Sequence, residues 1–219
     1  MQNSRSIYDN FAETAERRRN HTAVFYLGTQ YSYSRIRTLA DRFASALTDM
    51  GITAGHRVML YIPNSIHWVV SWLGVQKIGA VAVPITPIYT PHDISYIAND
   101  SDAEAIICAD TNFGYVTSVL PETGLKKVIV AKMADLLPWW KRFFGFLFDV
   151  VPRGKITLDQ NTYSFRALLS RYRDPSAPLT DNDRNGNAIA EILYTGGTTK
   201  FPKGVPITHN LFQIGRAHV

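Results

Sequence analysis

The chain has 219 residues and only one cysteine, Cys108. A single thiol cannot form an intrachain disulfide or supply a site built from several cysteines. Cys108 lies in the apolar segment EAIICAD, which is typical of a buried strand. A free cysteine in such a strand is much more often an inert core residue than a nucleophile. We therefore assign no catalytic or metal-binding residue here, and none elsewhere in the chain.

The sequence also lacks a long apolar run. Its most apolar stretch, LLPWWKRFFGFLFDVV at 136–151, is too short to cross a bilayer and is interrupted by Lys141 and Arg142. This pattern fits an amphipathic helix on the domain surface, or an interfacial helix whose aromatic face rests on lipid or guards an apolar substrate entrance. We favour the first interpretation, because aromatic stripes more often face a core. Peripheral membrane contact through 136–151 stays open as the second.

An apolar signal peptide is absent from the first twenty residues, which favours a cytoplasmic protein. The 23 Lys and Arg residues exceed the 18 Asp and Glu residues, which gives a net charge of +5. These basic residues are scattered, and the only clusters are Arg17-Arg18-Arg19, Lys126-Lys127 and Lys141-Arg142. Scattered charge is typical of a solvated surface, so we expect no nucleic-acid partner.

The first fifty residues predict two helices and a hairpin. The segment SIYDNFAETAE places Ile7, Phe11 and Ala15 on one helical face, and AVFYLGTQYSY reads as a hairpin with Gly28-Thr29 as its turn. A longer helix follows, for which Ser34 is a candidate cap and Gly51 the stop. The apolar positions of this helix repeat with a period of 3.6: Ile36, Leu39, Ala40, Phe43, Leu47 and Met50.

Strands and helices alternate from residue 57 to about 131. Strands are expected at 57–62, 80–85, 104–109 and 127–131, the last two as continuous apolar runs of the kind found in buried parallel strands. Asn64 or Ser65 can cap the helix after the first strand, and Thr90 with Pro91 and Asp93 marks the start of another. This order predicts an α/β fold, a doubly wound and mostly parallel sheet with flanking helices. The segment RDPSAPLTDNDRNGN at 173–187 reads as a surface loop.

A loop rich in Gly and Thr follows an apolar strand, AIAEILY at 188–194. It offers unobstructed amides, three hydroxyls and the ammonium group of Lys203, a set of donors that suits a polyphosphate. One rival interpretation is a plain hairpin turn, which does not account for the clustered threonines. The other is a P-loop, which fails because Pro202 stands in place of its second glycine and Gly204 in place of its magnesium-binding hydroxyl.

At this loop the chain resembles the adenylate-forming (AMP-binding) superfamily, which includes the acyl-CoA synthetases. The superfamily signature is Tyr-Thr-Ser-Gly-Thr-Thr-Gly-x-Pro-Lys-Gly-Val. Gly196 stands in place of the serine, and Lys200 stands in place of the glycine directly before the free position, which Phe201 fills. The resemblance extends upstream to Gly55-His56-Arg57-Val58 and Asn99-Asp100-Ser101. The residues that match the signature are Tyr194, Thr195, Gly197, Thr198, Thr199, Pro202, Lys203, Gly204 and Val205.

The resemblance implies a two-step reaction in which a carboxylate attacks the α-phosphate of ATP, and coenzyme A then displaces AMP from the acyl-adenylate. Mg²⁺ and cationic groups would stabilise the phosphates. The substrate is expected to be a medium- or long-chain fatty acid, because the aromatic segment at 136–151 suits a long apolar acyl chain. Thr208-His209 resembles the Thr-His pair that follows the signature, and we interpret it as a helix cap. The nucleotide-binding residues implied are Thr195, Gly196, Gly197, Thr198, Thr199, Lys203 and Gly204.

Members of this superfamily are more than twice as long as this chain. We expect residues 1–213 to be the N-terminal portion of the AMP-binding large domain, inactive by itself. Residues 214–219, IGRAHV, match one reading frame of a common sequencing adapter, so we expect a non-native tail. The alternatives are another adenylate-forming enzyme, either an aromatic acid–CoA ligase or a peptide-synthetase adenylation domain, and a non-catalytic α/β fragment.

Overall fold

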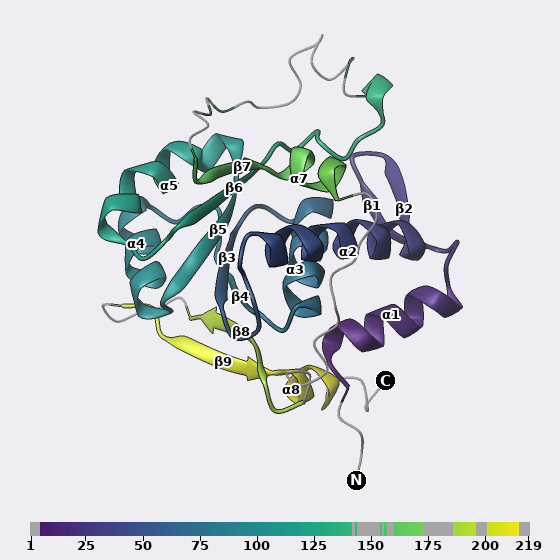
Figure 1. Cartoon of the computed structure of the whole chain (residues 1–219), viewed down its shortest axis with the longest axis horizontal. Coiled ribbons are helices and arrows are strands. Elements are labelled where there is room, and N and C mark those ends of the chain that lie inside the picture. The colour runs from purple at the N-terminus through teal and green to yellow at the C-terminus, as the bar shows by residue number, and fades with distance from the viewer. Residues whose placement is uncertain are drawn as a thin grey trace.

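A computed structural model describes residues 5–141, 143, 154, 156, 160–172, 186–195 and 201–214. Within these residues, seven strands form one sheet in the order β7-β6-β5-β3-β4-β8-β9 (Figure 1). All neighbouring strands pair in parallel except β8 and β9, which are antiparallel. The predicted doubly wound, mostly parallel sheet is therefore confirmed. The strands are β3 (Arg57–Tyr61), β4 (Val81–Pro84), β5 (Ala103–Ala109), β6 (Lys127–Ala131), β7 (Thr162–Ser164), β8 (Ile189–Tyr194) and β9 (Gly204–Thr208).

Helices cover both faces of the sheet because the chain reverses its winding direction after β4. One core cluster joins the sheet to α2 (Tyr33–Asp49), α3 (Ile66–Lys77) and α7 (Phe165–Arg171). The other joins it to α4 (Pro91–Asp100) and α5 (Phe113–Val119), which lie on the opposite side in Figure 1. Short 3₁₀ turns flank α5 at Asp110–Asn112 and Leu120–Glu122. Cys108 is buried in β5, where burial raises its thiol pKa, so the inert-core interpretation is confirmed.

The N-terminal hairpin forms one residue earlier than the sequence suggested. Strands β1 (Thr22–Tyr26) and β2 (Thr29–Ser32) are antiparallel, and Tyr26 pairs with Thr29. The turn is therefore Leu27-Gly28, and Thr29 already belongs to β2. Both turn residues have positive φ, +46° and +67°, as a tight two-residue hairpin requires. Sequence reasoning misplaced the turn because leucine rarely adopts that conformation.

The cap of α2 is Ser32 and not Ser34. The Ser32 hydroxyl accepts a hydrogen bond from the Arg35 amide at 3.2 Å, while Ser34 lies within the first helical turn. Strand β2 leads directly into the helix, so the last strand residue becomes the cap. The predicted stop is confirmed, because Gly51 follows the helix with φ of +78°.

The other predicted helix starts are also confirmed. Ser65, not Asn64, caps α3 by accepting a bond from the Trp68 amide at 3.2 Å. Thr90 and Asp93 form a reciprocal capping box at the start of α4. Helix α1 (Ile7–Arg17) has a similar box between Ser6 and Asp9.

The predicted aromatic helix is described only in part. Residues 139–141 and 143 are helical, and the side chains of Trp139, Trp140 and Phe143 are exposed. Residues 142 and 144–151, and most of the predicted loop at 173–187, lie outside the described residues. No helix in the described ranges combines the length and apolar character needed to cross a membrane.

Candidate functional site

The predicted phosphate loop connects β8 to β9. Tyr194 and Gly204 are paired in the antiparallel ladder, and the Thr195 amide donates to the Lys203 carbonyl at 3.1 Å. The connection is therefore a hairpin, as one rival interpretation expected. Gly196, Gly197, Thr198, Thr199 and Lys200 lie outside the described residues, so their phosphate contacts remain predictions.

Thr195 and Lys203 are brought together at the neck of this hairpin. Both are exposed, and no ion pair with a described residue engages the Lys203 ammonium. An exposed hydroxyl beside an exposed cation can hydrogen-bond and neutralise a phosphate group. The described part of the site therefore fits a nucleotide polyphosphate chemically.

Gly204 is needed for packing inside the hairpin. A Cβ atom at this position would lie 3.0 Å from the Ile192 side chain, 3.1 Å from a ring carbon of Tyr194 and 3.2 Å from its hydroxyl oxygen. These distances are shorter than ordinary carbon contacts, so a side chain at Gly204 would displace the ring. The sequence assigned Gly204 to phosphate binding, and the structure gives it a packing role of its own.

Helix α4 holds residues that sequence reasoning did not assign to the site. The Tyr194 hydroxyl donates to the Asp100 carboxylate at 2.6 Å, and the Phe201 ring stacks on Tyr96 with ring centroids 5.1 Å apart. Ile192 and Tyr194 also pack against the core cluster on the side of α4. A local signal for Asp100 existed, because a carboxylate at the C-terminal end of a helix opposes the helix dipole. No local pattern indicated its partner 94 residues away.

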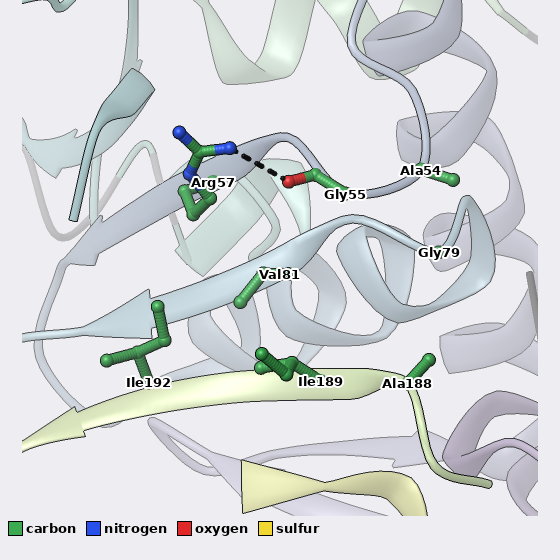
Figure 2. A pocket seen from close by; sticks show the side chains of 8 residues that line it. All are labelled: Ala54, Gly55, Arg57, Gly79, Val81, Ala188, Ile189 and Ile192. Atoms are coloured by element: carbon green, nitrogen blue, oxygen red, sulfur yellow. Dashed lines mark hydrogen bonds between the residues drawn. The ribbon is translucent and has the colours of Figure 1, made fainter. Parts of the chain in front are cut away.

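A separate surface hollow lies at the amino-terminal ends of β3, β4 and β8. Figure 2 shows its lining, which includes Arg57, Val81 and Ile189, and its volume is about 430 Å³. The Arg57 guanidinium already donates to two backbone carbonyls and pairs with Asp102 at 3.4 Å. No predicted nucleotide-binding residue lines this hollow, and we place no site in it.

Thr208 and His209 have the structural role that the sequence indicated. The Thr208 hydroxyl accepts a hydrogen bond from the Leu211 amide at 3.4 Å at the start of α8 (His209–Ile214). His209 is buried, and its Nδ1 accepts a bond from the Ile7 amide at 3.3 Å. This contact holds α8 against α1, as Figure 1 shows.

Residues 11–214 match the family of AMP-binding enzymes. The match extends over most of the chain, and it includes the β8–β9 hairpin and the helices on both faces of the sheet. The protein therefore belongs to the AMP-binding enzyme family.

Individual relatives are considerably longer than this chain. The long-chain-fatty-acid–CoA ligase of Bacillus subtilis is 27% identical over 94% of the chain, which spans 37% of that ligase. The medium/long-chain-fatty-acid–CoA/3-oxocholest-4-en-26-oate–CoA ligase of Mycolicibacterium smegmatis is 32% identical over 87% of the chain and 31% of the ligase. The crystal structure of a benzoate CoA ligase from Burkholderia xenovorans LB400 has the same fold, with a TM-score of 0.73 and 24% identity, over 96% of this chain and 36% of that one.

Proposed function

We propose that this protein is the N-terminal portion of an AMP-forming acid–CoA ligase. The whole enzyme would activate a carboxylic acid with ATP to an acyl-adenylate and then form a CoA thioester. The observation that carries the proposal is the phosphate-loop signature, which lies on the β8–β9 hairpin of a chain that belongs to the AMP-binding family. The family itself supports ATP and CoA as substrates, and Mg²⁺ is the cation that we propose for the ATP phosphates.

The described residues would bind phosphate and would perform no bond-breaking step. We propose that Lys203 neutralises charge on the β- and γ-phosphates and on departing pyrophosphate, and that the Thr195 hydroxyl donates to the same oxygens. Gly196, Gly197, Thr198 and Thr199 would supply amides and hydroxyls, and Gly204 would permit the close packing behind them. We assign no general acid, general base or nucleophile to this chain.

A medium- or long-chain fatty acid is the substrate that we propose. The support is indirect, because fatty-acid–CoA ligases of Bacillus subtilis and Mycolicibacterium smegmatis are among the similar proteins. An aromatic acid is the second candidate, since the fold of a benzoate CoA ligase matches equally broad parts of the chain.

The same proposal includes peripheral contact with a membrane through 136–151 of a cytoplasmic protein. Trp139 is 79% exposed and Phe143 is 59% exposed, which leaves apolar area on the surface. Tryptophan side chains often lie at membrane interfaces. Binding of the chain to lipid vesicles, and its loss in a Trp139→Ala/Trp140→Ala variant, would test this contact.

A chimera gives the sharpest test of the enzymatic proposal. Residues 1–213 would be joined to the part of the Bacillus subtilis ligase that this chain does not match. We expect fatty-acid-dependent ATP–pyrophosphate exchange from the chimera and none from the 219-residue chain alone. Positioning of carboxylate, phosphate and cation together supplies roughly 7 to 11 kcal/mol of barrier lowering, which a phosphate loop by itself does not provide.

Lys203→Ala in the chimera should slow exchange by roughly tenfold to a thousandfold. It should leave thioester formation from a supplied acyl-adenylate almost unchanged, because pyrophosphate has then already departed. Lys132→Ala, which removes another exposed lysine, is the control for a general effect of charge. Equal exchange by the Lys203→Ala and unmodified chimeras would remove Lys203 from the mechanism.

A further inference from the structure

Both ends of the β8–β9 connection touch the same face of α4. On the β8 side, the Tyr194 hydroxyl donates to the Asp100 carboxylate at 2.6 Å. On the β9 side, the Phe201 ring stacks on Tyr96, with an interplanar angle of 24°. Tyr96 and Asp100 are four residues apart, so their side chains project from one face of the helix. One rigid element thus contacts the residues that precede and follow the loop.

The hairpin is built so that Tyr194 reaches the helix. Gly204 leaves room for its ring, and the Thr195–Lys203 backbone bond closes the neck just beyond it. Burial, and then the hydrogen bond to Asp100, raise the pKa of the Tyr194 phenol. The hydroxyl therefore stays protonated at physiological pH and remains a donor to Asp100.

The two helix contacts have different origins in the sequence. Asp100 ends α4, where its negative charge lies beside the negative end of the helix dipole and disfavours the helix locally. The bond from Tyr194 offsets that cost with a tertiary contact. Phe201 occupies the free position of the signature, so its stacking on Tyr96 is a feature of this chain and is not specified by the signature.

We propose that Tyr96 and Asp100 are positioning residues for the nucleotide phosphates. They hold Phe201 and Tyr194, and through them the exposed donors Thr195 and Lys203, in a fixed arrangement. Two donors whose positions are already fixed lose less conformational freedom when they bind an anion, and this raises affinity. The inference rests on the proposed function, because it assigns a role to α4 in the same phosphate site.

The test is titration of the 219-residue chain with inorganic tripolyphosphate and with MgATP by calorimetry. Tyr194→Phe keeps the ring and removes the donor, and Asp100→Ala removes the acceptor. Each should weaken binding by about twofold to tenfold, the scale of one hydrogen bond. The double variant should be no weaker than either single variant, because both changes remove the same bond.

Four further variants separate positioning from a general effect on the fold. Asp100→Asn keeps an acceptor and removes a negative charge, so its affinity should equal or exceed that of the wild type. Phe201→Tyr should retain the stacking that Phe201→Ala removes. His92→Ala changes an exposed residue in the first turn of α4 and should bind like the wild type.

Hydrogen exchange of the peptide 192–205 is measured in the same samples. Faster exchange and weaker binding in Tyr194→Phe and Asp100→Ala support the inference. It is overturned when the wild type binds and these variants bind equally well. If the wild type binds neither ligand, the proposed phosphate site has failed and the positioning role fails with it, a result distinct from equal binding by all variants.

Discussion

The buried imidazole of His67 should make the stability of this protein depend on pH. The side chain is completely buried on α3 between aromatic rings, with centroids 5.3 Å from Phe165 and 6.2 Å from Tyr26. Neither ring nitrogen has a hydrogen-bond partner among the described residues. Burial without a partner disfavours the charged form and lowers the His67 pKa from 6.5 to about 4.

A lowered histidine pKa means that the unfolded chain binds more protons than the folded chain between pH 6.5 and pH 4. The contribution of His67 to stability is therefore complete above pH 6.5 and is lost as pH falls through this window. The full loss is about 3 kcal/mol, and about 2 kcal/mol of it is already lost at pH 5.

Urea denaturation of wild type and His67→Leu at pH 7.5 and pH 5.0 measures this effect. The variant should have a free energy of unfolding within about 1 kcal/mol of wild type at pH 7.5, because it removes unpaired polar atoms. Between pH 7.5 and pH 5.0 the variant should lose about 2 kcal/mol less free energy of unfolding than the wild type loses. Burial also lowers the His209 pKa, so a His209→Asn background separates the two histidines. Equal losses in wild type and His67→Leu would refute the reasoning.

Three other substitutions test packing and charge. Gly204→Ala should lower the free energy of unfolding by about 1 to 3 kcal/mol, because the Ile192 and Tyr194 side chains, 3.0 to 3.2 Å from the added Cβ, must shift to admit it. Gly114→Ala, with open space around it, should not destabilise the protein, and equal effects of the two changes would contradict the packing role. Lys77→Met breaks the partly buried ion pair with Asp41, 2.8 Å long, and should lower the free energy of unfolding in urea by about 1.5 to 3 kcal/mol, because Asp41 keeps the hydrogen bond from the Tyr8 hydroxyl. Burial raises the pKa of the Glu191 carboxyl in the folded protein, so stability is lost as pH rises above 4.5, the pKa of this group in the unfolded chain. In urea denaturation, Glu191→Gln should therefore stabilise the protein at pH 8 but not at pH 4. A stabilisation that is independent of pH would argue against this.

Much of the fold could be predicted because the signals are local. The buried face of α2 follows from apolar residues at helical spacing, and its end follows from Gly51, whose positive φ disfavours other residues. The capping box of α4 needs only Thr90 and Asp93, three residues apart. Continuous apolar runs correctly indicated parallel strands, since both faces of these strands are covered by helices.

The errors in the fold occurred where the sequence offers two equivalent local choices. Ser32 and Ser34 are both good helix caps, and the choice depends on how directly β2 joins α2. Similarly, Gly28 is a strong turn residue, but the pairing of Tyr26 with Thr29 decides that Leu27 is its partner in the turn. Strand register is a tertiary property, so single-residue shifts of this kind are not determined by propensity.

The candidate site shows the same division between local chemistry and tertiary placement. The Thr and Gly residues and Lys203 indicate an anion because amides, hydroxyls and a cation occur within a few positions of one another. Their support comes from Tyr96 and Asp100, which are separated from Phe201 and Tyr194 by about a hundred residues. They are brought together because the Ile192 and Tyr194 side chains of β8 lie on the face of the sheet that α4 covers. The sequence therefore predicts what the loop binds, whereas the folded sheet determines which helix contacts the two ends of the loop.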